Sequence, residues 1–372
     1  MVDLYGQYLK IREEIESAAA KVMESTAFIN GPQVGEFASN LAAKMGCRHV
    51  IPCGNGTDAL QIALMALGLE PGDEVIVPAF TYVASAEVIA LLGLTPVLAD
   101  VDYSTYNLTP EAMEKAITPR TKAVIPVHLF GEPCNMEAIM KIAREHGLYI
   151  VEDNAQSLGS CCSFGSGERR YSGTIGHFGC TSFFPSKNLG CYGDGGALFT
   201  DDSKLAQKAG MIANHGQRIK YRHEVIGCNS RLDTLQAVVL NAKLKHLDEY
   251  NNARAEAARH YTRSLGGIEE IALPVESTWG SHVYHQYTIK VKGGRRDALK
   301  EYLAKEGIPS MIYYPLPLHR QKAFGAISRV SGELTIAEKL CGEVLSIPMH
   351  TELTMEMLER ITGTIKRFFE KK

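Results

Sequence analysis

Between Thr181 and Thr200 the chain reads Thr-Ser-Phe-Phe-Pro-Ser-Lys-Asn-Leu-Gly-Cys-Tyr-Gly-Asp-Gly-Gly-Ala-Leu-Phe-Thr. Two short apolar runs, 181–184 and 197–200, flank a turn-rich middle that holds one lysine, Lys187, and four glycines. Such runs, bounded by glycine and proline, are typical of strands. A lysine just past a strand end can be desolvated, which lowers its pKa and makes its amine a nucleophile toward a carbonyl. Because buried lysines are rare, the alternative is a solvated lysine in a surface loop. Residues elsewhere in the chain must decide between these two interpretations.

Strand-length apolar runs and helical stripes alternate along the first two hundred residues. This alternation predicts an α/β domain with a mostly parallel central sheet and helices on both faces. Ligands of such sheets bind beyond the carboxyl ends of the strands. The expected strands include 73–78, 96–99, 122–128 and 148–152, and the expected helices include 5–25, 34–45, 85–92, 110–117 and 134–146.

Polar and aromatic residues gather at several of these expected strand ends. Asp153 could bind a protonated ring nitrogen, as a pyridine cofactor requires, or it could cap the following turn. Tyr82 could stack on a ring or belong to the core. His128 is interpreted as a hydrogen-bonded structural histidine. The convergence of these residues with Lys187 predicts a ligand site at one edge of the sheet.

Residues 49–67 combine a short apolar run, a glycine turn and a helix that we expect to begin at Thr57. Free N–H groups and the positive end of the helix dipole would point at an anion in the turn. The Thr57 hydroxyl could cap the helix or bind a phosphate oxygen, and these residues alone do not decide between the two. The turn lacks the Gly-Lys-Ser/Thr of a Walker loop.

Length and composition limit the class of protein. A chain of 372 residues predicts two domains. Its 39 basic and 42 acidic side chains give a net charge of -3, which offers no electrostatic reason for binding nucleic acid or an anionic membrane. No apolar run reaches membrane-span length, and the first residues do not resemble a signal peptide. The nine cysteines lack zinc-type spacing, so no metal site is expected and the thiols are interpreted as reduced, in a cytoplasmic protein.

The last third of the chain has a different, α+β pattern. Apolar spacing predicts one long helix over 231–250 that leads into a smaller domain. We therefore expect a large α/β domain at residues 1–250 and a small domain at residues 251–372. The expected elements of the small domain are the helices 251–261, 296–306, 333–344 and 355–369 and the strand 285–292.

Six motifs occur in one order along the chain and together resemble the DegT/DnrJ/EryC1/StrS family of sugar aminotransferases. The resemblance covers nearly the whole chain. It implies the type I fold of pyridoxal phosphate-dependent transferases and pyridoxal 5'-phosphate as cofactor. The motifs are Gly54-Asn-Gly-Thr-Asp-Ala-Leu, Pro78-Ala-Phe-Thr-Tyr, Glu152-Asp-Asn-Ala-Gln, Ser182-Phe-Phe-Pro-Ser-Lys, Gly193-Asp-Gly-Gly and the segment from Asn229-Ser-Arg to Gln236.

The resemblance also implies a role for each matching residue. Lys187 would form the Schiff base with the cofactor and later move the proton. Asp153 would hold the pyridinium nitrogen, so that the ring accepts electrons. The other implied cofactor contacts are Gln156 near the phenolic oxygen, Tyr82 stacked on the ring, Gly56, Thr57 and Ser182 on the phosphate, and Asn229 on the phosphate from a neighbouring subunit.

The family works on nucleotide-linked keto-sugars with L-glutamate as amino donor, as a homodimer with shared active sites. Some members have histidine at the position of Lys187 and act as dehydratases, so the lysine argues for amino transfer. The stretch 182–196 is most similar to members that aminate C3 of UDP-linked 2-acetamido-3-keto-glucuronate for lipopolysaccharide and O-antigen synthesis. The alternatives are C3 or C4 amination of a dTDP-linked keto-deoxysugar and a non-catalytic sensor with the same fold.

Three residues are candidate substrate contacts. Arg231 could bind a carboxylate through its planar fork or form a structural ion pair. Tyr314 and His319 resemble family positions that line the sugar site, and core packing is the alternative for both.

Overall fold

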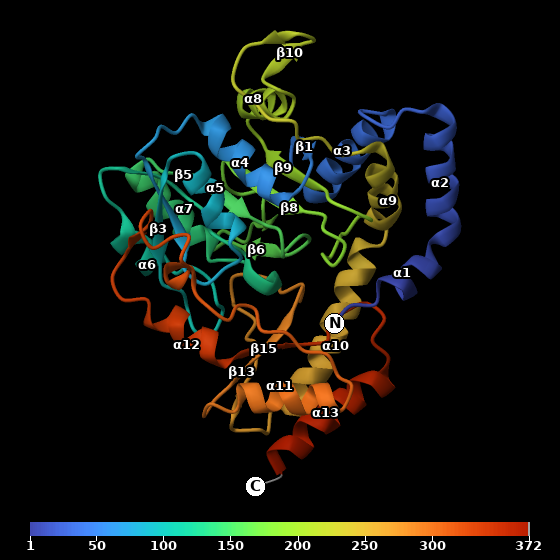
Figure 1. Cartoon of the computed structure of the whole chain (residues 1–372), viewed down its shortest axis with the longest axis vertical. Helices are drawn as coiled ribbons and strands as arrows, with labels where there is room; N and C mark the ends of the chain where they lie inside the picture. Colours follow the sequence, from blue (N-terminus) through green and yellow to red (C-terminus); the bar gives the residue numbers. More distant parts are fainter. Residues whose placement is uncertain (371–372) are drawn as a thin grey trace.

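The central feature of the computed structural model, which describes residues 1–370, is an eight-stranded sheet (Figure 1). The strand order is β1-β9-β8-β5-β4-β2-β3-β14. The strands from β8 to β14 pair in parallel, whereas β9 is antiparallel to both of its neighbours, so the predicted mostly parallel sheet is confirmed. The strands are β1 His49–Cys53, β2 Glu74–Pro78, β3 Thr95–Ala99, β4 Thr121–Val124, β5 Tyr149–Asp153, β8 Phe178–Ser182, β9 Gly196–Thr200 and β14 Arg329–Val330.

Helices cover both faces of this sheet because its strands are apolar on both sides. In β2, Val75 and Val77 belong to one core and Ile76 between them belongs to another. That alternation follows from the strand period of two residues. The helices packed in the first core are α4 Gly56–Leu67, α5 Ala84–Leu91 and α8 Ser203–Ala213. The helices α6 Pro110–Ala116 and α7 Met136–His146 belong to the second, and α3 Pro32–Met45 and α9 Thr234–Leu244 form a further core with β9.

A smaller three-stranded antiparallel sheet, with strand order β12-β13-β15, has its own core. Tyr261 and Tyr287 are fully buried there, with ring centroids 5.0 Å apart. The strand β14 lies in the large sheet although it comes from the C-terminal third, so the domain boundary remains a prediction. The elements of this part are α10 Leu247–Leu265, β12 Ile271–Ala272, β13 Tyr287–Val291, α11 Arg296–Lys305, η2 Leu318–Arg320, α12 Thr335–Glu343, β15 Val344–Ile347 and α13 Met355–Glu370.

Two of the long helices expected from the sequence are each divided in two. The predicted helix 231–250 is wrong, because α9 ends at Leu244 and α10 begins at Leu247. His246 has non-helical backbone angles, φ -102° and ψ 2°, and its Nδ1 lies 3.1 Å from Glu249 Oε2. The predicted helix 5–25 is likewise divided, at Ile11, into α1 Leu4–Lys10 and α2 Arg12–Ser25.

The remaining elements are short and lie at the edges. A hairpin of β10 (Gln217–Ile219) and β11 (Arg222–His223) projects beyond α8 at the top of the molecule (Figure 1). A second hairpin pairs β6 (Cys161–Ser163) with β7 (Arg169–Tyr171), and η1 spans Leu129–Gly131. Among residues 1–370, no helix combines the length and the apolar character that crossing a lipid bilayer requires.

Candidate active site

A cavity of about 640 Å³ opens beyond the carboxyl ends of β2, β5 and β8. The ends of these strands meet at one edge because they are parallel neighbours through β4. The structure therefore brings together most of the residues that the sequence singled out. Those that line the cavity are Gly56, Thr57, Tyr82, Asp153, Gln156, Ser182, Lys187 and Tyr314.

Lys187 lies in a tight turn that follows β8. Its N–H donates to the carbonyl of Phe184 at 2.8 Å, and a Cβ on Gly190 would lie 2.4 Å from the carbonyl oxygen of Pro185. Burial lowers the pKa of the Lys187 amine to about 8, and the Asp153 carboxylate acts in the opposite direction. No hydrogen bond or ion pair to another of residues 1–370 holds this amine, so it is available to a ligand in the cavity.

Asp153 ends β5 and is 6% exposed. Its Oδ2 accepts a hydrogen bond from Ser85 Oγ at 2.7 Å, and its Oδ1 accepts one from the Ala155 N–H at 3.1 Å. No arginine or lysine forms an ion pair with it within the described part of the chain. A buried carboxylate held by two donors and lacking a cationic partner fits a protonated ring nitrogen.

The N-terminus of α4 lies beside the end of β8. Asn55 is the N-cap, because its Oδ1 accepts from the Asp58 N–H at 2.8 Å, so of the two roles considered for Thr57 the capping one is not found. The Thr57 hydroxyl and the first N–H groups of the helix thus remain available to an anion. A Cβ on Gly56 would lie 2.7 Å from Ser182 Cβ, so only glycine lets the helix end approach the strand end this closely.

Gln156, Tyr82 and Tyr314 form the wall above these groups. Gln156 is oriented from two sides, since its Oε1 accepts from the Phe130 N–H at 2.8 Å and its Nε2 donates to the Tyr314 hydroxyl at 3.2 Å. The Tyr82 ring, 55% exposed, lies 6.2 Å from the Tyr314 ring between centroids. An aromatic face this exposed is open to stacking on a planar ligand.

Three predicted contacts do not line the cavity of their own chain. Asn229 is exposed and forms an isolated bridge with Asn214. Arg231 forms no ion pair within residues 1–370, so the structural ion pair considered for it is not found there. His319 Nε2 lies 2.9 Å from Glu338 Oε1. One copy of the chain therefore holds most, but not all, of the predicted site.

The structure also adds residues that sequence reasoning missed. Ser85 donates to Asp153, and Phe130, His285 and Asp194 line the cavity. Phe130 has a positive φ of 58°, which no sequence pattern indicated. His285 comes from the segment before β13, and nothing local distinguishes it from the predicted structural His128, which is fully buried between Glu152 and the Cys134 N–H.

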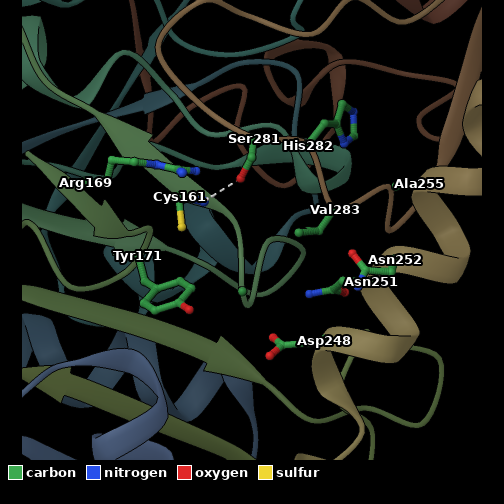
Figure 2. Close-up of a pocket in the computed structure, with 11 residues that line it drawn as sticks. Cys161, Arg169, Tyr171, Asp248, Asn251, Asn252, Ala255, Ser281, His282 and Val283 are labelled. Carbon is green, nitrogen blue, oxygen red and sulfur yellow. Dashed lines mark hydrogen bonds between the residues drawn. The ribbon is translucent and has the colours of Figure 1, made fainter. Parts of the chain in front are cut away.

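A second cavity, of about 710 Å³, contains neither Lys187 nor Asp153. It is lined by the hairpin β6–β7, by α10 and by residues 281–283 (Figure 2). Figure 2 shows the hydrogen bond between the Ser281 hydroxyl and the backbone N–H of Cys161, 2.9 Å long, with Asn251 and Asn252 on the helix across the cavity. The segment 281–286 thus borders both cavities, because His285 and Gln286 line the first one.

The fold and the first cavity define a class of protein. A half-buried amine of lowered pKa, a carboxylate without a cation, an open aromatic face and a helix N-terminus together match the aldehyde, ring nitrogen, ring face and phosphate of pyridoxal phosphate. The class is that of the pyridoxal phosphate-dependent transferases.

The family model for the DegT/DnrJ/EryC1/StrS aminotransferases matches residues 9–366. The chain belongs to this family, and it is a sugar aminotransferase. One relative is a UDP-N-acetyl-3-dehydro-α-D-glucosamine 3-aminotransferase from Acidithiobacillus ferrooxidans, 45% identical over 99% of this chain and 97% of the relative. A UDP-2-acetamido-2-deoxy-3-oxo-D-glucuronate aminotransferase from Pseudomonas aeruginosa is 43% identical over 98% of both chains. A dTDP-3-amino-3,4,6-trideoxy-α-D-glucose transaminase from Streptomyces venezuelae is 40% identical over 100% and 96%.

Solved structures agree in fold and cofactor. DesV of S. venezuelae, in complex with a ketimine intermediate, superimposes with a TM-score of 0.95 at 40% identity, covering 100% of this chain and 98% of the other. The NtdA protein of Bacillus subtilis, with bound cofactor PMP, gives a TM-score of 0.90 at 31% identity, covering 97% and 82%. The predicted fold, family and pyridoxal phosphate cofactor are confirmed.

Proposed function

We propose that this enzyme transfers an amino group from L-glutamate to C3 of a UDP-linked 2-acetamido-3-keto-sugar, with Lys187 as the cofactor-binding lysine. The observation that carries the assignment of Lys187 is its place in the cavity that Asp153, Tyr82 and the α4 N-terminus also line. No other lysine lines this cavity within the described residues. The amine's low pKa supports the role, because only a neutral amine attacks a carbonyl.

Each residue of the cavity would have a separate role in binding the cofactor or in moving the proton. Asp153 would hold the cofactor ring nitrogen in its protonated form, and Ser85 fixes the carboxylate that does so. Gly56, Thr57 and Ser182 would hold the phosphate at the α4 N-terminus, with Gln156 at the ring edge. When bound, the cofactor supplies a conjugated ring that accepts electrons from the substrate carbon. The Lys187 Nζ would take the proton from the amine-bearing carbon of the substrate and give it back at a neighbouring position, so a single base would be enough.

The choice of sugar rests on the relatives and on Arg231. Two of the relatives described above act on UDP-linked 3-keto-sugars, one of them a uronate, and one acts on a dTDP-linked sugar at slightly lower identity. Arg231 has no ionic partner within residues 1–370, so its guanidinium is free for a substrate carboxylate. We therefore favour the 3-keto-glucuronate, with lipopolysaccharide or O-antigen synthesis as the use of the product.

A dimer with shared sites completes the proposal. Asn229 and Arg231 lie outside the cavity of their own chain, and the projecting hairpin exposes Ile219 and Tyr221, 55% and 80% exposed. Ile226, 85% exposed, follows it. Exposed apolar side chains that surround an exposed polar contact are typical of a surface that binds another copy.

The test begins with the absorbance spectrum of the purified protein with pyridoxal phosphate. Glutamate should convert the yellow form to the pyridoxamine form, and Lys187→Ala should abolish the adduct that borohydride traps. A Lys187→Ala protein that still gives the trapped adduct would refute the assignment of Lys187. UDP-linked 3-keto-glucuronate and 3-keto-glucosamine should then be compared with dTDP-linked keto-sugars, with Arg231→Met as the variant that should selectively lose the uronate.

The shared site has its own experiment. Lys187→Ala and Asn229→Asp proteins should each be inactive, and equal mixing of the two after subunit exchange should restore about a quarter of the activity, from the one intact site of each mixed dimer. Failure to restore activity, although subunits exchange, would show that Asn229 acts within its own chain.

A further inference from the structure

Ser230 is a buried serine whose hydroxyl joins two groups at the start of α4. The side chain belongs to a residue that is only 2% exposed. Its Oγ accepts a hydrogen bond from the Gly54 N–H at 2.9 Å and donates one to Asp58 Oδ2 at 2.6 Å. A backbone N–H can only donate and an ionised carboxylate can only accept, so the direction of both bonds is fixed. One hydroxyl thus holds the turn before α4 and a carboxylate of the helix together.

The backbone of Ser230 is held by a different part of the chain, the end of α8. The Ser230 N–H donates to the Ala213 carbonyl at 2.9 Å, and the Cys228 N–H donates to the Ile212 carbonyl at 2.8 Å. These bonds do not involve α4. Ser230 is therefore a fixed point to which the Asp58 side chain is attached.

Asp58 is an acidic residue at a place where an anion is expected. It is the third residue of α4 and lines the active-site cavity together with Gly56 and Thr57. A carboxylate in the first turn stabilises a helix, because it interacts favourably with the helix dipole. The same charge would repel a phosphate at the free N–H groups of that turn, since like charges repel strongly where little water separates them. The direction in which this carboxylate points therefore matters for anion binding.

The hydrogen bond to Ser230 keeps the Asp58 carboxylate on the side of the turn that faces away from the cavity. A Cβ on Gly54 would lie 2.9 Å from Asp58 Oδ2, and neither Gly54 nor Ser230 lines the cavity. Two thiols outside the cavity are affected by the carboxylate. Burial first, and then the charge of Asp58, raise the pKa of the Cys53 thiol and of the Cys228 thiol.

We propose that Ser230 is a positioning residue for the phosphate site, because its hydroxyl holds the Asp58 carboxylate away from the anion that the α4 N-terminus binds. The helix keeps the stabilising acidic residue in its first turn, and the phosphate does not face the charge of that residue. The inference rests on the placement of the cofactor phosphate at Gly56, Thr57 and Ser182 that is proposed above.

The test compares pyridoxal 5'-phosphate with pyridoxal, which lacks the phosphate. Absorbance titration of the full chain gives a Kd for each compound. Ser230→Ala should raise the Kd for pyridoxal 5'-phosphate about tenfold and leave the Kd for pyridoxal nearly unchanged. The loss should become smaller at high ionic strength, because salt screens the repulsion between the two charges.

Two further substitutions of Ser230 separate the hydroxyl from the fold. Ser230→Thr keeps the hydroxyl and should bind both compounds as the native chain does. Thermal unfolding checks that each variant is folded. If Ser230→Ala does not fold, Ser230→Cys carries the comparison, because a thiol fills similar space but is a weak donor.

Double variants test whether the charge of Asp58 is the cause. In an Asp58→Asn chain the charge is absent, so adding Ser230→Ala should no longer weaken the binding of pyridoxal 5'-phosphate. Asp194→Asn is the matched control, because Asp194 lines the same cavity whereas the Ser230 hydroxyl donates to Asp58. In an Asp194→Asn chain, Ser230→Ala should keep its full effect.

Equal weakening of both compounds by Ser230→Ala, or a loss that persists in the Asp58→Asn chain, overturns the inference. Thr57→Val distinguishes this failure from failure of the proposed phosphate site. If Thr57→Val weakens only pyridoxal 5'-phosphate and Ser230→Ala does not, the inference alone is refuted. If neither variant discriminates between the two compounds, the phosphate binds elsewhere and both proposals fail.

Discussion

Replacing Lys187 should stabilise the cofactor-free fold. Burial lowers the pKa of Lys187 from 10.5 to about 8, so the folded state holds a charged amine in an unfavourable place at neutral pH. A shift of this size corresponds to about 3 kcal/mol. The amine faces a cavity that admits water, which reduces the penalty, so we expect Lys187→Met to gain about 1–2 kcal/mol at pH 7.

The pH dependence of this stability difference tests whether the buried charge of Lys187 causes it. Below pH 8 the lysine is charged in both the folded and the unfolded chain, and the full penalty is present. Between pH 8 and 10.5 the lysine loses its proton in the folded chain but keeps it in the unfolded chain. The penalty therefore falls as the pH rises, and the stability gained by Lys187→Met falls with it. Urea unfolding of the native and Lys187→Met chains at pH 7 and at pH 10 measures this difference.

Lys243→Met is the matched control. Lys243 is 1% exposed and burial also lowers its pKa to about 8, but its Nζ donates to the Gly190 carbonyl at 2.8 Å. Its replacement leaves that carbonyl unpaired and should not stabilise the chain. A destabilising Lys187→Met, or a gain that stays constant up to pH 10, would refute the reasoning.

Three further predictions concern the hydrogen bonds or packing of Asp153, Gly56 and Glu74. Ser85→Ala removes the donor to Asp153 Oδ2 and should lower kcat/KM about tenfold, measured by steady-state kinetics with native Tm as the control. Gly56→Ala places a Cβ 2.7 Å from Ser182 Cβ and should weaken cofactor binding at least about tenfold by titration, with Ser182→Gly relieving the clash and restoring the Tm. Burial opposes ionisation of Glu74, yet hydrogen bonds from a threonine and two arginines lower its pKa to about 2. Glu74→Gln should therefore cost about 2 kcal/mol at pH 7, a difference that is lost as pH falls from about 4.5 to 2; a constant difference would contradict the ionic origin.

The parts of the fold that local patterns determine were predictable from the sequence. Strands such as β2 are buried on both faces, and their apolar runs end at residues that the parallel order brings to one edge. Lys187, Asp153 and Tyr82 meet for that reason. The sequence indicated a turn at Gly56. The close approach of Gly56 to β8, however, joins two segments that are distant in the chain, so it is seen only in the structure.

The errors have local physical causes. The helix expected to begin at Thr57 begins one residue earlier, at Gly56, because the Asn55 side chain accepts from the Asp58 N–H and caps it. The helical spacing of apolar residues in 231–250 continues across Lys245 and His246. The backbone of His246, however, leaves the helical conformation and separates α9 from α10. The periodicity of apolar residues indicates which face of a helix is buried. It does not indicate that a single residue has non-helical backbone angles.

Residues that act on a site from other segments could not be predicted in this way. The segment 283–286, which brings His285 to the cavity, is held by hydrogen bonds with Arg254, Phe130 and Asn188, none of which is near it in the chain. The strand β14 likewise joins the edge of the large sheet from the C-terminal third. Such placements are long-range packing results, and a single sequence carries no periodic signal for them.

Placement by distant segments also explains why the type of reaction is better determined than the substrate. The groups that would contact the cofactor lie in one chain's cavity, and their geometry can be checked residue by residue. The groups that would choose the sugar, Arg231 and His319, lie outside that cavity, together with Asn229. If a second copy brings them to the site, the sugar specificity is a property of the dimer, and a variant that only weakens dimerisation should lose the discrimination between sugars as it loses activity. If they act elsewhere, discrimination should survive in whatever activity remains, and Tyr313, Tyr314 and the rest of the cavity wall must supply it.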